Sequence, residues 1–318
     1  MNSPCLVTGG AGFIGSHLVE RLLREHPEGR VRVLDDFSTG SMANLPFAAA
    51  AGARLEVVRG DIRDLATVER VAAGAAVIFH QAAMRSVPRS VADPLGANAS
   101  NVDGTLNVLE AARRAGVRRV VYASSSSVYG DRPELPKHEE QPPAPISPYA
   151  VSKAAGEQYA AVWHRLYGVE TVGLRYFNVF GPRQDPASEY AAVIPRFILW
   201  GLRGQPLEVH GDGRQSRDFT YIDNVVEANC LAAEAPGAGG VFNVGCGDRV
   251  SLLQIIERLE ALLGRPVERR HTPARAGDVA HTLADIGRAK RVLGYTPLVP
   301  FDEGLQRTFD YFNRGRSA

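Results

Sequence analysis

The sequence predicts a doubly wound α/β fold, in which helices cover both faces of a parallel sheet, followed by a smaller mixed C-terminal substrate domain. Over the first 180 residues, short apolar runs without polar alternation are separated by helical patterns, as expected for strands buried on both faces. A glycine-rich turn joins the first run to the first helical pattern. We place the sheet domain at 1–180, with a return of the chain near 219–245, and the second domain at 181–318.

Six strands of the sheet domain are expected at the apolar runs. These runs cover residues 5–8, 31–34, 55–58, 77–80, 120–124 and 171–176. Helical patterns lie between them, at 16–25, 102–115 and 149–167. Gly116 and Gly168 directly follow the last two helices, where glycine ends a helix readily because it tolerates positive φ.

Beyond Gly181 the pattern changes, because prolines interrupt it at 182, 186, 195 and 206. A helix is expected at 223–233 and a strand at 241–244. An amphipathic helix is expected at 251–263, with Ser251 as its N-cap, since a serine hydroxyl accepts a hydrogen bond from the first turn. These mixed elements indicate the smaller second domain.

The composition narrows the class of protein. The chain has 318 residues with 36 Lys and Arg against 35 Asp and Glu, so its formal net charge is +1 (36 − 35), which argues against a nucleic-acid-binding protein with a basic face. The three cysteines are widely spaced and include no CxxC pair, so neither a disulfide framework nor a metal site is expected. With no signal peptide and no run of 18 apolar residues, we expect a cytoplasmic protein without a membrane partner.

The glycine-rich turn predicts a site for a dinucleotide. It reads TGGAGFIG at 8–15, between the first strand and the first helix. Glycines at 9, 12 and 15 allow a tight turn, close approach to a pyrophosphate and close helix packing. Asp35 ends the second strand 20 residues later, where a carboxylate accepts hydrogen bonds from an adenosine ribose and repels a 2′-phosphate. This pattern favours NAD over NADP, whereas a glycine triplet alone is also found in ordinary turns.

Hydroxyl groups gather where the fifth strand ends, at Ser124 to Ser127. Tyr149 and Lys153 follow at the start of a helix, four residues apart and therefore on one face. A tyrosine titrates near pH 10, but a neighbouring ammonium and a positive nicotinamide ring should lower its pKa. A phenolate prepared in this way could accept a proton from a substrate hydroxyl while hydride leaves the same carbon.

The sequence resembles the extended short-chain dehydrogenases/reductases and, among them, the NAD-dependent epimerase/dehydratase family. The resemblance rests on motifs along the whole chain: TGGAGFIG at 8–15, GDI at 60–62, HQAA at 80–83, SSSSVYG at 124–130, YAVSK at 149–153, RYFNVFGPRQDP at 175–186, SRDFTYIDN at 216–224 and RAGDVAHTLADI at 275–286. It implies a Rossmann-type sheet, NAD as cofactor, a UDP-sugar as substrate and a homodimer. The most similar subgroups are the UDP-N-acetylglucosamine and UDP-glucose 4-epimerases.

The resemblance also implies a role for particular residues. Those expected to hold NAD are Gly9, Gly12, Phe13, Ile14, Gly15, Asp35, Asp36, Asp61, Ile62, Gln81, Ala82, Ala83, Asn101, Tyr149, Lys153 and Tyr176. Those expected to bind the sugar nucleotide are Arg85, Ser125, Asn178, Val193, Arg217, Arg275 and Thr282. Tyr149, Lys153 and Ser125 are expected to be catalytic, with Ser126 as a helper at the sugar.

The residues after Ser125 bear on the type of reaction. Family members that eliminate water or carbon dioxide carry a carboxylic acid there, whereas this chain has Ser126 and Ser127, which favours a 4-epimerase. Thr282 stands where related epimerases restricted to plain hexoses carry a tyrosine, which predicts UDP-GlcNAc/UDP-GalNAc together with UDP-Glc/UDP-Gal as substrates. Two alternatives stay open: a UDP-glucuronate 4-epimerase, whose relatives usually carry threonine in place of Asn178, and a catalytically silent NAD-binding scaffold.

Overall fold

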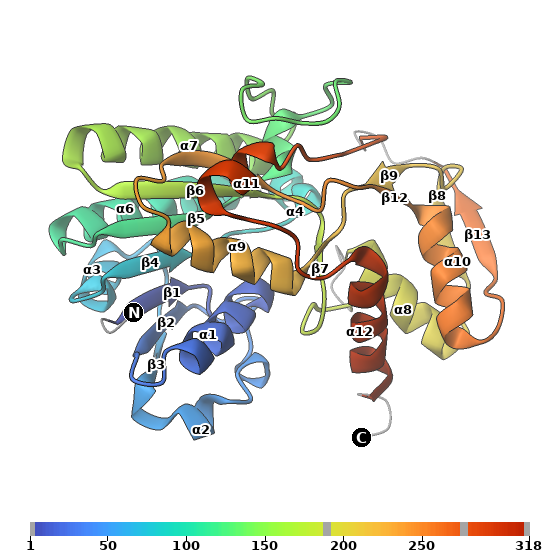
Figure 1. Ribbon diagram of the computed structural model, residues 1–318, viewed down its shortest axis with the longest axis horizontal. Coiled ribbons are helices and arrows are strands. Elements are labelled where there is room, and N and C mark those ends of the chain that lie inside the picture. The colour runs from blue at the N-terminus through green and yellow to red at the C-terminus, as the bar shows by residue number, and fades with distance from the viewer. Residues whose placement is uncertain (1–3, 187–191, 274–278, 315–318) are drawn as a thin grey trace.

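The computed structural model describes residues 4–186, 192–273 and 279–314. Its centre is a seven-stranded parallel sheet in the order β11-β6-β5-β4-β1-β2-β3 (Figure 1). The strands are β1 (Cys5–Thr8), β2 (Val31–Asp35), β3 (Leu55–Arg59), β4 (Val77–His80), β5 (Arg119–Ser125), β6 (Glu170–Tyr176) and β11 (Gly240–Val244). The predicted doubly wound fold is therefore confirmed, and β11 from the C-terminal half pairs with β6.

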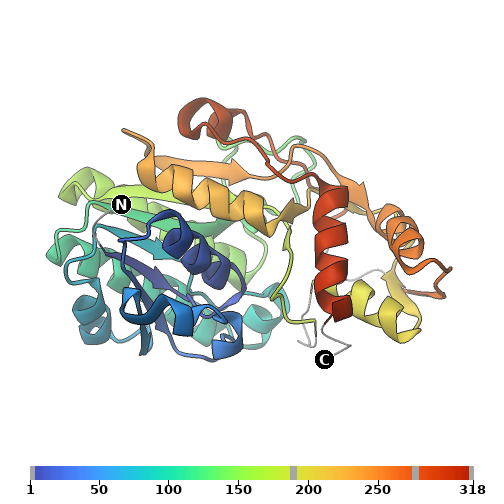
Figure 2. The same cartoon turned by 60° about the horizontal axis from the view of Figure 1, so that its bottom comes forward.

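Helices cover both faces of the sheet, as Figure 2 shows. One layer contains α3 (Leu65–Ala72), α6 (Gly104–Arg114) and α7 (Pro148–Tyr167), and the other contains α1 (Phe13–Glu25), α9 (Ile222–Glu234) and α11 (Gly287–Leu293). Alternate residues of β1 serve the two layers, since Leu6 packs with the first and Cys5 and Val7 with the second. This burial on both faces explains why the strands lack polar alternation.

Several short elements complete this part of the chain. They are η1 (Met42–Asn44), α2 (Ala48–Ala51), η2 (Gly52–Arg54), α4 (Val87–Ala92), α5 (Pro94–Asn98), η3 (Ala99–Asp103) and η4 (Ser126–Tyr129). The segment η3 is a π-helical turn that runs directly into α6, so the helix expected at 102–115 has an irregular beginning. The first helix begins at Phe13, three residues before its expected start at 16, because the glycine turn leads into it without a loop.

The second lobe is built from helices and short strand pairs. Its helices are α8 (Val193–Arg203), α10 (Leu252–Leu263) and α12 (Phe301–Arg314). Its strands are β7 (Val179–Phe180) with β10 (Thr220–Tyr221), β8 (Leu207–His210) with β13 (Arg269–Thr272), and β9 (Ser216–Arg217) with β12 (Val250–Ser251). Ser251 caps α10 as predicted, since its hydroxyl accepts a hydrogen bond from the Gln254 backbone N–H at 3.2 Å.

Two buried polar side chains hold the crossing segments together. The carboxylate of Asp218 accepts hydrogen bonds from the backbone N–H groups of Cys246 at 2.8 Å, Gly247 at 3.0 Å and Ala284 at 3.1 Å. Burial nevertheless raises the pKa of Asp218 to about 6. Asn224 accepts two further backbone hydrogen bonds, from residues 298 and 299. These contacts fix the chain between the sheet and the second lobe.

None of the helices in the described part of the chain has the length and apolar character of a membrane span.

Candidate active site

The carboxyl ends of four adjacent strands place the candidate site. Thr8, His80, Ser125 and Tyr176 end β1, β4, β5 and β6, and parallel pairing brings these ends to one edge of the sheet. His80 joins two segments there, because its ring nitrogens lie 2.7 Å from the Thr8 hydroxyl and 3.0 Å from the Thr105 hydroxyl. Burial lowers the pKa of His80 to about 3, so this ring is neutral and structural.

The glycine turn forms a cradle, and any larger residue in place of Gly9 or Gly15 would clash with the neighbouring backbone. Gly9 has a φ of +68°, and a Cβ atom on it would lie 2.7 Å from the Ala82 nitrogen. A Cβ atom on Gly15 would lie only 2.1 Å from the Gly9 oxygen. The helix α1 begins directly after Gly12, so its first backbone N–H groups, including those of Phe13 and Ile14, are available to an anion. The turn therefore fits a pyrophosphate.

Asp35 joins this cradle to the end of β2. Its carboxylate oxygens accept hydrogen bonds from the backbone N–H groups of Ala11 and Phe37, both at 2.9 Å. The side chain is buried and lies beside the glycine turn, where its remaining lone pairs suit a ribose. The next residue, Asp36, is exposed and accepts a hydrogen bond from the Ser38 N–H at 2.8 Å.

The third strand is followed by Asp61 and Ile62, two further residues expected at the cofactor. The Asp61 carboxylate pairs with Arg63, which lowers its pKa. Ile62 is buried against α6, where a Cβ atom on Gly104 would lie 2.6 Å from its side chain. The Ile62 carbonyl accepts a hydrogen bond from the Asn107 amide at 3.0 Å, and a contact of Ile62 with the cofactor stays a prediction.

The segment that follows β4 is held by polar contacts. Gln81 and Tyr176 both bond to Asn229 of α9, at 3.0 Å and 3.1 Å, and the Ala82 N–H donates to the Thr8 hydroxyl at 3.3 Å. Ala83 continues this segment towards Met84. Sequence reasoning missed Asn229, because nothing in a helical pattern marks the residue that meets two distant strand ends.

Asn101 lies in the π-helical turn and binds the same segment. Its side chain accepts a hydrogen bond from the Met84 N–H at 2.7 Å, and donates to the Met84 carbonyl at 3.1 Å and to the Ser152 hydroxyl at 3.0 Å. The amide therefore positions the chain next to Arg85. A direct contact of Asn101 with the cofactor stays a prediction.

Tyr149, Lys153 and Ser125 meet beside the cradle. The Lys153 ammonium lies 5.9 Å from the centre of the Tyr149 ring and donates to the Ala123 carbonyl at 2.9 Å. Ser125 forms a side-chain hydrogen bond with Tyr149. The hydroxyl of Ser127, which sequence reasoning did not single out, donates to Ser125 at 2.8 Å. Ser126 lies between these two serines in the sequence and is the first residue of the turn η4.

The electrostatics differ from the sequence-based expectation. Burial raises the pKa of Tyr149, while the Ser125 hydrogen bond and the charge of Arg85 lower it in part. In the protein without a bound dinucleotide, desolvation of the phenolate outweighs these contacts, and the lowering expected from Lys153 together with a nicotinamide ring stays a prediction. Burial also lowers the pKa of Lys153 to about 8, against the charge of Glu157. Arg85 is exposed, and its charge acts on Tyr149.

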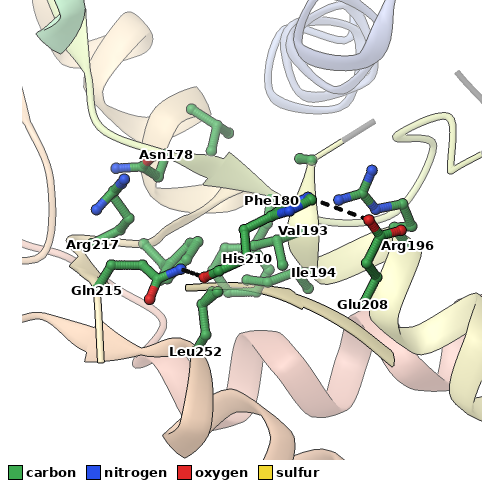
Figure 3. Close-up of a pocket in the computed structure, with 13 residues that line it drawn as sticks. Asn178, Phe180, Val193, Ile194, Arg196, Glu208, His210, Gln215, Arg217 and Leu252 are labelled. Carbon is green, nitrogen blue, oxygen red and sulfur yellow. Dashed lines mark hydrogen bonds and ion pairs between the residues drawn. The ribbon is translucent and has the colours of Figure 1, made fainter. Parts of the chain in front are cut away.

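A cavity of about 230 Å³ lies in the second lobe (Figure 3). It brings together three of the residues expected at the sugar nucleotide, Asn178, Val193 and Arg217. Thr282 adjoins them, because its hydroxyl accepts a hydrogen bond from the Asn178 amide at 3.3 Å. Arg275 lies outside the described residues.

Sequence reasoning missed several residues that line this cavity. They are Val179, Phe180, Ala192, Ile194, Arg196, Glu208, His210, Gln215, Phe219 and Leu252. In Figure 3 the side chains of Glu208 and His210, both from β8, face the cavity together with Arg196 of α8. Along β8 the buried Leu207 and Val209 alternate with Glu208 and His210, and this alternation is the signal that could have found the latter two.

Known proteins are similar to this chain over nearly its whole length. The model of the NAD dependent epimerase/dehydratase family matches residues 5–245. A UDP-glucose 4-epimerase of Mycolicibacterium smegmatis is 42% identical over 309 residues, covering 96% of this chain and 97% of the relative. A solved UDP-N-acetylglucosamine 4-epimerase of Methanobrevibacter ruminantium, in complex with UDP-N-acetylmuramic acid, has a TM-score of 0.93 and 39% identity, covering 99% of each chain. A Thermus thermophilus UDP-glucose 4-epimerase in complex with NAD has a TM-score of 0.88 and 39% identity, covering 98% of this chain and 99% of that chain.

The position of Asp35 predicts the choice of dinucleotide. Asp35→Asn is expected to weaken NAD binding and to narrow the preference for NAD over NADP, because the variant loses the charge that repels a 2′-phosphate. Hydrogen bonds to a charged group contribute about 1.5–3 kcal/mol, so the loss of NAD affinity should be about tenfold or more. Calorimetric titration with both dinucleotides measures it. Asp36→Asn is the matched control, and an equal loss in that variant would assign the ribose to Asp36 instead.

Proposed function

The chain belongs to the NAD-dependent epimerase/dehydratase family, and we propose that it is a 4-epimerase of UDP-sugars. The observation that carries this proposal is the meeting of Tyr149, Ser125 and Lys153 beside the dinucleotide cradle. The names of similar proteins, UDP-glucose 4-epimerase and UDP-N-acetylglucosamine 4-epimerase, support a UDP-sugar epimerase.

NAD is the cofactor of this family, and the cradle of this chain fits it. The turn at Gly9, Gly12 and Gly15 leaves room for the pyrophosphate, and Asp35 suits the adenosine ribose. When bound, NAD supplies a reversible acceptor for hydride from C4 of the sugar, which passes through a transient 4-keto form.

Tyr149 is the residue that we assign to proton transfer at the 4-hydroxyl of the sugar. Its phenolate accepts the hydroxyl proton during oxidation and returns it when the 4-keto sugar is reduced, so the residue is unchanged after turnover. Lys153 stabilises the phenolate by its charge, and Ser125 holds the Tyr149 oxygen by a hydrogen bond. Because the pKa of Lys153 is about 8, the ammonium predominates at neutral pH and is lost as the pH rises above that value.

The residues around Ser125 favour epimerisation over elimination. Elimination at the neighbouring carbons needs an additional acid and base, and Ser126 and Ser127 occupy the two positions after Ser125. Ser127 is also committed to Ser125 through its hydrogen bond. Epimerisation requires only that the proton and the hydride return after the 4-keto sugar has turned over.

The preferred sugars that we propose are UDP-GlcNAc and UDP-GalNAc, with UDP-Glc and UDP-Gal also accepted. The small Thr282 side chain, next to Asn178 at the cavity, leaves room for a 2-acetamido group. UDP-glucuronate is the second candidate, because the charge of Arg85 acts near Tyr149 and a guanidinium binds carboxylates well. Asp185 faces the same guanidinium and offsets its charge, which favours uncharged hexoses.

A test of the function is product analysis with UDP-Glc, UDP-GlcNAc and UDP-glucuronate in parallel. We expect interconversion at C4 of the first two, without net consumption of NAD. Tyr149→Phe should lower kcat by about 10²–10⁴-fold, the usual contribution of general acid–base catalysis. Turnover of UDP-glucuronate alone would favour the second candidate. Bound NAD without conversion of any of the three would indicate a catalytically silent scaffold.

Thr282→Tyr tests the choice of sugar. The larger side chain should lower kcat/KM for UDP-GlcNAc by about tenfold or more, since overfilling a packed site costs roughly 1–3 kcal/mol. Activity with UDP-Glc should persist, and Thr282→Ser, which keeps the hydroxyl on a still smaller side chain, should retain both substrates. An equal loss of activity with both sugars in Thr282→Tyr would show that position 282 does not determine the choice of sugar.

We also propose that two copies of the chain associate through α7. This helix exposes a stripe of large apolar side chains, namely Val151, Tyr159, Val162, Leu166 and Tyr167. The helices α4 and α5 pack beside it and expose Val91 and Leu95, which are 62% and 82% accessible. A two-fold axis through this surface would bury the same apolar stripe of both copies.

Leu166→Asp is the variant that tests this association. An unpaired carboxylate buried within the stripe should turn a dimer into a monomer, as measured by sedimentation equilibrium. The matched control is Val292→Asp on α11, which also replaces an exposed apolar residue and should leave the mass unchanged. A monomeric parent protein would contradict the proposal.

A further inference from the structure

A buried carboxylate lies behind the candidate catalytic residues and has no part in the reaction as described so far. Glu157 stands one helical turn after Lys153 on α7, and 5% of its surface is exposed. It accepts a hydrogen bond from the Ser124 hydroxyl at 2.5 Å. Arg175 of β6 binds both of its oxygens, at 2.8 Å and 2.7 Å. Such a pair is costly to bury, so its place in the site needs a reason.

Glu157 and Lys153 hold consecutive residues at the end of β5. Lys153 donates to the carbonyl of Ala123 at 2.9 Å, and Glu157 accepts from the hydroxyl of Ser124. The next residue is Ser125, which carries the hydrogen bond to Tyr149. The two side chains of α7 therefore set where Ser125 stands relative to Tyr149 on the same helix.

The charged and titratable groups around Lys153 come from four elements. Tyr149 and Glu157 lie on α7, His80 lies on β4, and Tyr122 on β5 and Arg175 on β6 face Glu157. His80 is neutral, because burial lowers its pKa to about 3. Of these groups in the described part of the chain, Glu157 is the one whose negative charge favours the protonated form of Lys153.

We propose that Glu157 is a positioning residue for the reaction: its carboxylate keeps Lys153 protonated and fixes the end of β5 that presents Ser125. This inference rests on the proposed function, in which the ammonium of Lys153 supports the phenolate of Tyr149. The competing explanation is that Glu157 serves only to neutralise the buried Arg175, whose guanidinium also stacks 4.7 Å from the centre of the Tyr129 ring.

A double variant separates the two explanations. Glu157→Gln combined with Arg175→Met removes both charges together, so no unpaired buried charge remains, and the glutamine oxygen can still accept from Ser124. If Glu157 only neutralises Arg175, this variant should behave as the parent protein. If Glu157 supports Lys153, its loss lowers the pKa of that amine, and the ammonium disappears at a lower pH.

The first measurement is the pH dependence of kcat with a UDP-sugar. We expect the activity of the parent to fall as the pH rises through the pKa of Lys153, because the ammonium is lost there. In the double variant we expect this fall to begin about one pH unit lower, because the variant lacks the negative charge that raises the pKa of Lys153. Arg119→Met with Glu170→Gln is the matched control, since it removes the ion pair at the other end of the same two strands. That control should keep the parent profile. An unshifted profile in a folded double variant would overturn the proposal.

The second measurement needs no substrate. Ultraviolet absorbance of tyrosinate, taken as the difference from Tyr149→Phe, follows the ionisation of Tyr149 in the protein with NAD. The double variant should form the Tyr149 phenolate at higher pH than the parent, and an identical titration would contradict the role of Glu157. If the parent converts no UDP-sugar, the proposed function is wrong. This titration still tests whether Glu157 acts on Tyr149 through Lys153.

Ser124→Ala tests the positioning role separately, and it does so even if the double variant does not fold. This variant keeps both charges of the pair but removes the link from Glu157 to the end of β5. We expect kcat to fall severalfold, with KM and the alkaline limb of the pH profile unchanged. A kcat equal to that of the parent would overturn the positioning of Ser125 by Glu157.

Discussion

The parallel pairing of β1, β4, β5 and β6 is the constraint on which the site depends. Parallel strands all end at the same edge of the sheet. Thr8, His80, Ser125 and Tyr176 are therefore neighbours, although they span more than half of the chain. The glycine turn begins at that edge, and α7 packs against the ends of β5 and β6. The glycine turn and the hydroxyl groups of the site are therefore neighbours in the fold, although they lie far apart in the sequence.

The buried polar contacts then make this edge rigid. Lys153 and Glu157 hold the end of β5 from one side, while Asn229 holds Gln81 and Tyr176 from the other. These groups are expensive to bury, and each is satisfied by its partners. Rigidity of this kind suits a reaction in which hydride and proton leave and return to the same atoms, because small displacements cost much of the rate.

The fold and the cradle could be predicted because their signals are local. Apolar runs gave six strands of the sheet nearly to the residue, and Gly9 and Gly15 have the close contacts that exclude a side chain. The short helices α4 and α5 were not predicted, since prolines and small residues hide their pattern. The roles of Asn229, Ser127 and Glu157 were also missed, because each acts on a residue from another element or turn.

The sequence by itself determined the doubly wound fold, the glycine cradle and the pairing of Tyr149 with Lys153 on one helical face, because periodicity and short spacings suffice for these. Only the tertiary structure decided the balance of charges. Burial, which no spacing reveals, raises the pKa of Tyr149 and lowers that of Lys153, against the expectation from their proximity alone. Tertiary structure also decided that Asn178, Val193 and Arg217 share one cavity, since the chain segments that carry them meet only after folding.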